Sequence, residues 1–302
     1  MDNSRPARIL ALDGGGIRGV FTAAFLAHLE QHLRIRWVEH LELLTGTSTG
    51  AILALSLAAG LTAQEALEAY KEASPLIFGN GRHRVGRLFA TAHDNTPLVE
   101  WLKRMFQDKT LDSARVPVAI PTFDASTGSP QVWKGNHHQD LHAGGDKRMW
   151  EIALASAAAP TFLPAVQLEG RGAYLDGGLW ANNPALVGWI EAQRYLGYET
   201  RALRLLSVGT GRKKKWLRYE DIRQRGQIGW AREVIELQFA AQSVAIHEQV
   251  KLLLPKGSYL RIDEELPHAI GLDDVREIDT LEHLGLKAGM VHLQEVKRML
   301  GL

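Results

Sequence analysis

The sequence contains no cysteine, which excludes disulfides, a thiolate nucleophile and cysteine-ligated metal sites. It has little net charge: the formal value is +1, so the chain lacks the strong positive field typical of proteins that bind nucleic acid polymers. Its longest apolar stretch, residues 51–59, is far shorter than the roughly 20 residues of a membrane-spanning helix. Residues 1–8 are polar and lack the apolar segment of a secretion signal. We therefore expect a cytoplasmic protein whose contact with any membrane is peripheral.

Apolar residues, by contrast, are plentiful: they make up 45% of the 302 positions, enough for one large domain with a substantial core. Residues 9–12 predict a strand that runs into a glycine loop, and residues 20–33 have helical periodicity. Residues 41–45 predict a second buried strand, and residues 51–59 predict a second helix. This alternation indicates an α/β protein, a three-layer α/β/α fold around a central and mostly parallel sheet.

The later part of the chain continues this pattern and becomes mainly helical. Thr62 and Glu65 form a capping box for a helix that we expect to stop before Pro75. Further elements are a hairpin at 116–123 and 131–134, strands at 173–175, 203–208 and 259–262, and helices at 149–158, 228–254 and, broken near Gly285, at 272–300. No repeat or Pro/Ser-rich linker divides the chain, so we expect residues 1–211 to form the core and residues 212–302 to be a mainly helical C-terminal part of the same domain.

Ser48 is the strongest candidate for a nucleophile. It is the centre of a G-x-S-x-G motif flanked by Gly46 and Gly50, with a predicted strand before it and a predicted helix after it. Glycines on both sides allow the cramped backbone of a nucleophile elbow, which presents the hydroxyl to a substrate. The motif therefore predicts acyl-transfer chemistry at Ser48.

A glycine-rich loop near the N-terminus offers the donors that such chemistry needs. Gly14, Gly15 and Gly16 follow a strand and open a helix, so their N–H groups can point into one concavity and hold an oxyanion. Arg18 either contributes charge or braces the loop, and Gly19 ends it.

The same loop also matches the G-x-G-x-x-G dinucleotide fingerprint. That interpretation needs an acid at the end of the second strand, where this chain has the serine motif instead and keeps Glu42 inside the strand. A phosphate-binding P-loop is disfavoured as well, because Val20 follows Gly19 where a lysine is required. The glycine loop thus suits the serine better than a nucleotide cofactor.

Asp176 is the candidate base, since it follows a short predicted strand and precedes Gly177 and Gly178. The alternative is an ordinary Asx-turn residue. A Ser-Asp-His triad would also fit this chain order, with the histidine drawn from His247, His268, His283 and His292. None of these histidines lies in a glycine-rich turn that would single it out.

Taken together, the three glycine turns resemble the patatin-like phospholipases, whose pattern is an Asp-Gly-Gly-Gly-x-Arg/Lys-Gly loop, a G-x-S-x-G elbow and a later Asp-Gly-Gly/Ala. The matching residues here are 13–19, 46–50 and 176–178, in the same order. The resemblance implies a patatin-like fold and a Ser-Asp dyad without histidine, in which Ser48 attacks an ester carbonyl and Asp176 takes its proton.

Flanking residues extend the resemblance to the bacterial patatin-like phospholipases that act as effectors of cyclic-oligonucleotide antiphage defence; they include 155–162, 180–184 and 260–263. This implies hydrolysis of membrane phospholipid at the inner face of the membrane, no cofactor, activation by a cyclic dinucleotide such as cGAMP, and assembly into a homo-oligomer. Two alternatives stay open: a general patatin-like lipase without nucleotide control, and a nucleotide-binding sensor without hydrolysis.

Three polar segments have weaker interpretations. Residues 212–216 (RKKKW) and the basic residues Arg82, His83, Arg84 and Arg87 would suit anionic headgroups or phosphates, or simply a solvated loop or lid. His137, His138 and His142 with Asp140 match no zinc spacing, so we assign no metal.

Overall fold

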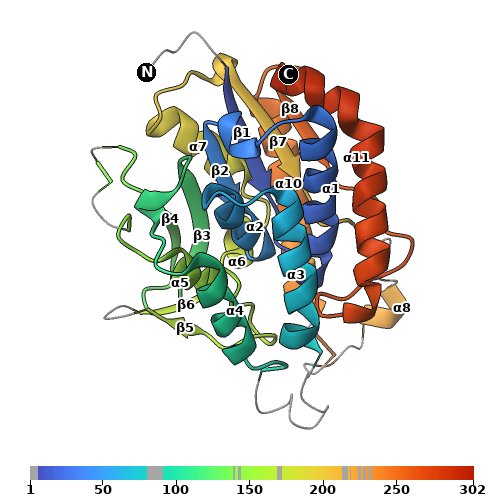
Figure 1. The fold of residues 1–302 in the computed structure, drawn as a ribbon. Helices are drawn as coiled ribbons and strands as arrows, with labels where there is room; N and C mark the ends of the chain where they lie inside the picture. The colour runs from blue at the N-terminus through green and yellow to red at the C-terminus, as the bar shows by residue number, and fades with distance from the viewer. Residues whose placement is uncertain are drawn as a thin grey trace.

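The computed structural model describes residues 6–79, 91–138, 140–141, 144–168, 172–212, 217, 219–223, 226, 229–230 and 233–302. Its centre is one mixed sheet in the order β5-β6-β3-β2-β1-β7-β8, with β4 paired to β3 (Figure 1). The strands are β1 (Ala7–Leu12), β2 (Leu43–Gly46), β3 (Val118–Asp124), β4 (Ser129–Lys134), β5 (Val166–Gln167), β6 (Ala173–Asp176), β7 (Leu203–Val208) and β8 (Tyr259–Ile262).

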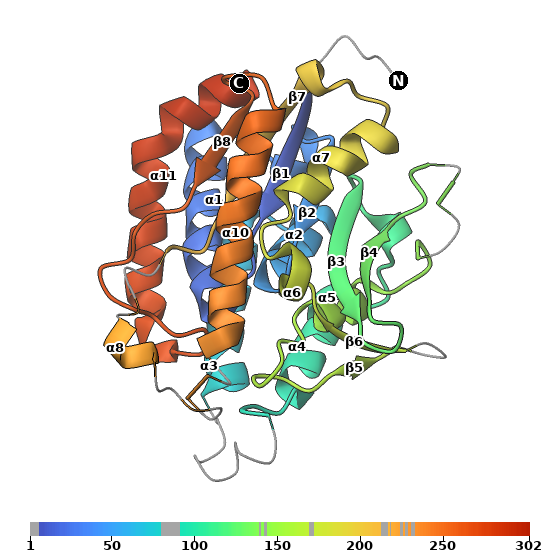
Figure 2. The ribbon, with the colours of Figure 1, turned by 180° about the vertical axis from the view of Figure 1, so that it is seen from behind.

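Helices cover both faces of the sheet, as the sequence predicts for three layers (Figures 1 and 2). One face carries α1 (Gly19–Leu33), α2 (Thr49–Ala58), α3 (Ala63–Phe78), α4 (Thr96–Phe106), α5 (Met149–Ser156) and α11 (Ile278–Leu300). The other carries α6 (Gly178–Ala181), α7 (Ala185–Arg194) and α10 (Glu233–Leu253), while the short α8 (Tyr219–Ile222) lies at the edge. No helix of the described ranges is long and apolar enough to cross a bilayer.

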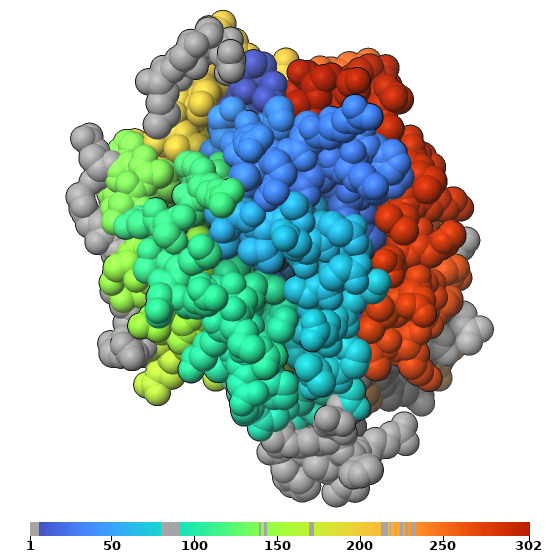
Figure 3. All heavy atoms as spheres, viewed as in Figure 1, coloured from blue at the N-terminus to red at the C-terminus, as the bar shows by residue number. Residues whose placement is uncertain are grey.

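Alternation along the strands explains the two core layers. In β1, Leu10 and Leu12 belong to the main core under α1 and α2, while Ile9 and Ala11 face the core under α7. A parallel strand that is apolar on both faces needs cover on both sides, which the two helix layers provide. On the first face, α1, α3, α4 and α11 lie side by side and form a continuous surface (Figure 3).

The register of β3 explains how the C-terminal ends of β2 and β6, which are far apart in the sequence, come to meet. Ala119 of β3 pairs with Thr45 of β2 on one edge and with Lys134 of β4 on the other, whereas Thr122 pairs with Asp176 of β6 and with Gln131 of β4. Because β4 occupies one whole edge, β2 and β6 must share the opposite edge. β2 is parallel to β3 and β6 is antiparallel, so their C-terminal ends point at each other.

Two predicted helix breaks are wrong. α3 starts at the predicted Thr62/Glu65 capping box but runs through Pro75 to Phe78, because Ile77 is buried in the core beyond the proline and Gly79 N–H still donates to the Pro75 carbonyl. Proline lacks a backbone N–H, and at Pro75 this removes a single hydrogen-bond donor from the last turn of the helix.

α11 is likewise one helix instead of two broken near Gly285. A Cβ at Gly285 would collide with the Phe21 carbonyl of α1, and one at Gly289 would come within 2.8 Å of the His28 ring. The two glycines therefore let α11 approach α1 closely. Small residues four apart on one helix face mark a helix crossing here, not a turn.

The C-terminal segment joins the same sheet and core. β8 pairs in parallel with β7, and Leu281, Val296 and Leu300 of α11 belong to the main core. The predicted division of one domain into a core at 1–211 and a C-terminal part at 212–302 stays a prediction.

Candidate active site

Ser48 sits at the turn between β2 and α2, and its backbone is strained. Its φ of 55° and ψ of −122° lie outside the regions that a non-glycine residue favours. The strained turn is held in place because Ser48 N–H donates to Ser156 Oγ (3.0 Å), whose hydroxyl in turn donates to the Pro121 carbonyl (2.7 Å). Strain that the surroundings maintain is characteristic of functional sites.

Gly46 and Gly50 make the tight turn possible by their size. Neither has a positive φ; instead, a Cβ on Gly46 would collide with the Gly50 carbonyl, and one on Gly50 would collide with the Leu12 carbonyl. The unusual conformation belongs to Ser48 itself. The glycines are needed because the start of α2 packs directly on the ends of β1 and β2.

Asp176 ends β6 and is completely buried, at 0% exposure. Its Oδ1 accepts a hydrogen bond from Gly178 N–H (2.7 Å), and its Oδ2 has no hydrogen-bond partner among the described residues. Burial raises the pKa of Asp176 to about 7, against the opposing effects of the Gly178 N–H and the nearby Ser48 hydroxyl. The contact with Ser48 does not have the geometry of a full hydrogen bond, as is common before a substrate binds.

The two glycines after Asp176 allow other segments to approach. A Cβ on Gly177 would collide with the Pro121 carbonyl, and one on Gly178 would lie 2.8 Å from the Phe239 ring of α10. Both positions therefore exclude a larger side chain. The turn is pressed between β3 and α10, which fixes the direction of the Asp176 carboxyl.

The pKa of Asp176 sets an expected pH dependence. A carboxyl acts as a base only when ionised, so ester hydrolysis should rise with pH up to about 7 and level off above it. Below that value we expect kcat/KM to fall about tenfold per pH unit. The measurement is kcat/KM for a soluble ester between pH 5 and 9, and a profile that stays flat from pH 5 to 8 would contradict Asp176 as the base.

The glycine loop between β1 and α1 is fixed on several sides. The Gly16 carbonyl accepts hydrogen bonds from Thr49 Oγ1 (2.8 Å) and Tyr70 OH (2.9 Å), and Ile17 N–H donates to the Leu272 carbonyl (2.8 Å). Gly14 N–H donates to the Asn182 carbonyl (3.1 Å) and so is already occupied. Gly15 and Gly16 have no acceptor for their N–H groups among the described residues, which leaves these two as available donors.

Arg18 braces this loop. Its guanidinium donates to the Gly211 carbonyl (3.2 Å) and to the Gly15 carbonyl (3.4 Å), so it ties the loop to the end of β7. Gly19 is needed for packing, since a Cβ there would collide with the Thr49 side chain. Of the two predicted roles for Arg18, these contacts favour bracing.

A buried ion-pair network behind the loop was not predicted from sequence. Arg261 of β8 makes a bidentate contact with Asp13, at 2.7 Å from Nη1 to Oδ1 and 2.6 Å from Nη2 to Oδ2. Arg261 also donates to Asp263 (3.0 Å), and Ser243 of α10 donates to Asp13 (3.1 Å). Burial raises the pKa of Asp13 to about 6 in spite of the opposing Arg261. The signal available in the sequence is an Arg within an otherwise apolar strand and an Asp directly after that strand.

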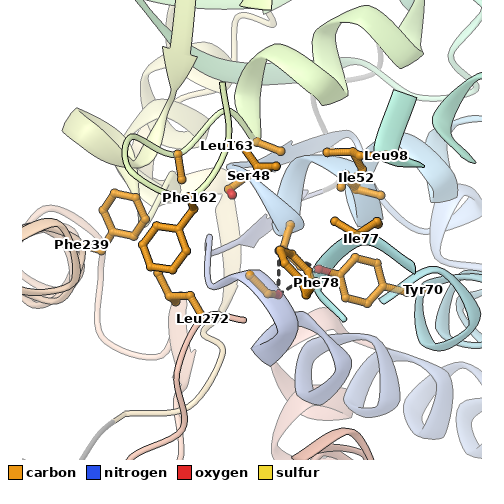
Figure 4. Close-up of a pocket in the computed structure, with 14 residues that line it drawn as sticks. Ser48, Ile52, Tyr70, Ile77, Phe78, Leu98, Phe162, Leu163, Phe239 and Leu272 are labelled. Carbon is orange, nitrogen blue, oxygen red and sulfur yellow. Dashed lines mark hydrogen bonds between the residues drawn. The ribbon is translucent and has the colours of Figure 1, made fainter. Parts of the chain in front are cut away.

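An apolar pocket lies beside Ser48 (Figure 4). Side chains from α2, α3, α4, α10 and the segments after α5 and before α11 line it, namely Ile52, Tyr70, Ile77, Phe78, Leu98, Phe162, Leu163, Phe239 and Leu272. Such a lining suits an acyl chain.

The other predicted candidates lie elsewhere. His247 contacts Tyr259 (3.1 Å), His268 contacts Glu277 and His292 contacts Glu264 (both 2.8 Å), and no contact joins these or His283 to Asp176 among the described residues. The histidine triad is therefore unsupported.

His137 pairs with Glu191 (2.9 Å) and His138 with Asp140 (3.6 Å). Outside the described residues lie Arg82, His83, Arg84, Arg87, His142 and residues 213–216.

Comparison with known proteins decides the family. Residues 10–189, more than half of the chain, match the model of the family described as patatin-like phospholipase. The chain belongs to this family. Like its members, it is a hydrolase that acts on ester bonds of lipids.

Two relatives and one solved structure illustrate the relationship of this patatin-like phospholipase. It is 32% identical to a Pseudomonas aeruginosa protein named cGAMP-activated phospholipase, over 93% of this chain and 84% of the relative. It is 31% identical to an Escherichia coli protein named cUMP-AMP-activated phospholipase, over 69% of this chain and 66% of the relative. The crystal structure of VipD from Legionella pneumophila matches 96% of this chain and 67% of that protein with a TM-score of 0.54 at 11% identity, which is a likeness of fold.

Proposed function

We propose that this chain cleaves acyl esters of membrane phospholipids with Ser48 as nucleophile and Asp176 as base, and that a cyclic dinucleotide switches this activity on. The observation that carries the first part is the pairing of a strained Ser48 with a buried carboxyl whose Oδ2 has no other partner. The names of the two relatives support the second part.

The reaction begins when Ser48 Oγ attacks the ester carbonyl and its proton passes to Asp176. The N–H groups of Gly15 and Gly16 stabilise the oxyanion, with Gly14 holding the loop through Asn182. The tetrahedral intermediate collapses, the C–O bond breaks, and Asp176 returns the proton to the departing lysophospholipid oxygen. Water then attacks the acyl-enzyme as Asp176 takes its proton, and the released Ser48 oxygen regains a proton as the fatty acid leaves. Protein groups and water carry every step.

The raised pKa of Asp176 suits this role. A carboxylate with an ordinary pKa near 4 is a weak base towards a serine hydroxyl, and burial brings the value to about 7, close to working pH. The buried carboxylate of Asp176 thus takes the part that histidine has in a catalytic triad.

The substrate also implies a location. For a chain that contacts phospholipid peripherally, the proposed place of action is the cytoplasm, at the inner face of the membrane. Assembly into homo-oligomers stays a prediction.

The test is phospholipid hydrolysis on liposomes by the purified protein, with and without each member of a panel that includes cGAMP and cUMP-AMP. We expect one nucleotide to raise fatty-acid release at least tenfold, and Ser48→Ala to release none. Hydrolysis that no nucleotide changes would identify a general lipase without nucleotide control. Nucleotide binding without any hydrolysis would identify a sensor and overturn the proposed chemistry.

A further inference from the structure

The acyl pocket is too small, in this conformation, for the substrate that it would receive. The cavity beside Ser48 has a volume of about 40 Å³, room for about three water molecules. The acyl chain of a membrane phospholipid is far larger. A long chain reaches Ser48 only if part of the pocket wall moves.

The two sides of the pocket differ in how firmly they are held. Ile52, Ile77 and Leu98 belong to the main core shared by α2, α3 and α4, so their displacement would disrupt close packing throughout that layer. On the other side, Ala159, Phe162, Phe239 and Leu272 form a small apolar cluster of their own, which we call the gate cluster. Figure 4 shows Phe162, Phe239 and Leu272 together on one side of Ser48, with Ile52, Ile77 and Leu98 on the other.

The three large side chains of the gate cluster come from three different segments. Phe162 follows α5, Phe239 lies on α10, and Leu272 precedes α11. All three side chains are almost completely buried, at 3–4% exposure. The cluster thus closes the pocket by contact between three side chains that do not belong to the main core.

His93 connects two of these segments. Its backbone N–H donates to the Phe162 carbonyl (2.9 Å), and its Nε2 lies 2.9 Å from Asp273 Oδ2, next to Leu272. Thr161, the residue before Phe162, has a φ of 70°, which is strained for a β-branched side chain. The closed arrangement therefore contains a local backbone strain at Thr161.

Phe239 links the gate to the dyad. It packs against Gly178, the residue whose N–H holds Asp176 Oδ1, and Gln238 and Gln242 of the same helix bond to Leu179 and Asn183. A movement confined to the first turns of α10, which carry Phe239, would open the pocket and leave the main core in place, because that core contains no described side chain of α10.

We infer that Phe239, closing on Phe162 and Leu272, determines which acyl chains reach Ser48: short chains enter the closed pocket, and long chains enter only when α10 carries Phe239 aside. This inference rests on the proposed function, because it takes Ser48 as the point of attack.

Chain-length dependence tests the inference. We expect Phe239→Ala to raise kcat/KM for p-nitrophenyl decanoate at least tenfold relative to p-nitrophenyl acetate, and Phe239→Trp to lower the same ratio. Leu237→Ala is the matched control, because Leu237 is an apolar residue on the same helix that is 37% exposed and does not line the pocket. It should leave the ratio unchanged. An unchanged ratio in Phe239→Ala would overturn the inference.

A binding measurement separates this inference from the proposed chemistry. In the Ser48→Ala background, Phe239→Ala should bind the fluorescent fatty acid cis-parinaric acid at least tenfold more tightly, with no turnover required. Equal affinities would refute the gate even if the dyad is correct. Ester rates that are equal in the unmodified protein and in Ser48→Ala would refute the dyad and leave the binding result to decide the gate. If Phe239→Ala fails to fold by thermal unfolding, Phe239→Leu keeps more of the packing and should change both readouts in the same direction.

Discussion

Ser48→Ala is expected to lower ester hydrolysis at least 10⁴-fold, to the level of the uncatalysed background, while leaving the fold intact. The covalent route needs the Ser48 oxygen, because the neighbouring hydroxyls of Thr47 and Thr49 already donate to the carbonyls of Ala181 and Gly16. Alanine keeps the Cβ, so the packing of the elbow on Ser156 through the backbone N–H is retained.

Asp176→Asn should be equally severe, for a different reason. The amide has the shape of the carboxyl but accepts no proton at neutral pH, so Ser48 stays a neutral hydroxyl. Burial raises the pKa of Asp176 from about 4 to about 7, because the ionised carboxylate is less stable in the folded protein than in water. The carboxyl therefore destabilises the folded state progressively as pH rises from 4 to 7, and the asparagine variant escapes this loss.

These two variants are measured together by kcat/KM on a soluble ester and by thermal unfolding at pH 5 and pH 8. We expect both to lose activity, and Asp176→Asn to be more stable than the unmodified protein at pH 8, by an amount set by ~1.4 kcal/mol per pKa unit. Ser56→Ala, a buried serine on the same helix as the elbow, is the control and should keep its activity. Full activity in either dyad variant would refute the dyad.

Arg261→Gln is expected to destabilise the protein by about 3–5 kcal/mol, because it leaves the buried Asp13 without its cation. The same change should loosen the oxyanion loop, since Asp13 is the residue immediately before Gly14. Arg261 therefore positions the loop through Asp13 without touching the substrate. Arg261→Lys should recover only part of the loss, because one ammonium cannot reproduce the bidentate contact.

A double-mutant cycle in urea checks this interpretation. Asp13→Asn removes the negative charge that Arg261→Gln leaves unpaired. The double variant should therefore lose less free energy of unfolding than the sum of the losses in the two single variants. If Arg261 had only a structural role, its substitution would lower the stability and leave kcat and KM of the folded protein unchanged. If the substitution loosens the loop, it should lower kcat with little change in KM. Additive free energies of unfolding would contradict the coupling.

Much of the site could be predicted because its signals are local. A strand, a glycine turn and a helix recur at Gly14 and at Ser48, and each needs only neighbouring residues to form. The same holds for β7, which spans the predicted residues 203–208, and for the capping box at Thr62. The family model confirms the family that these motifs indicated.

Other features depend on contacts between distant segments. Glycine and proline are both typical of helix ends, which is why the sequence predicted breaks at Gly285 and Pro75. Packing against α1 and the core nevertheless keeps both helices continuous. Arg261 and Phe239 look like ordinary residues of a strand and an amphipathic helix. Their partners, Asp13 and Gly178, lie far away in the chain, so local patterns contain no information about the pairing.

The sequence by itself determined the two chemical groups and the turns that present them: a serine in an elbow, a carboxyl before two glycines, and a loop of N–H donors. Only the tertiary structure decided that these groups meet. Because β2 and β6 approach along the same edge of β3 from opposite directions, Ser48 and Asp176 arrive at one point, and burial there raises the pKa of the carboxyl to about 7.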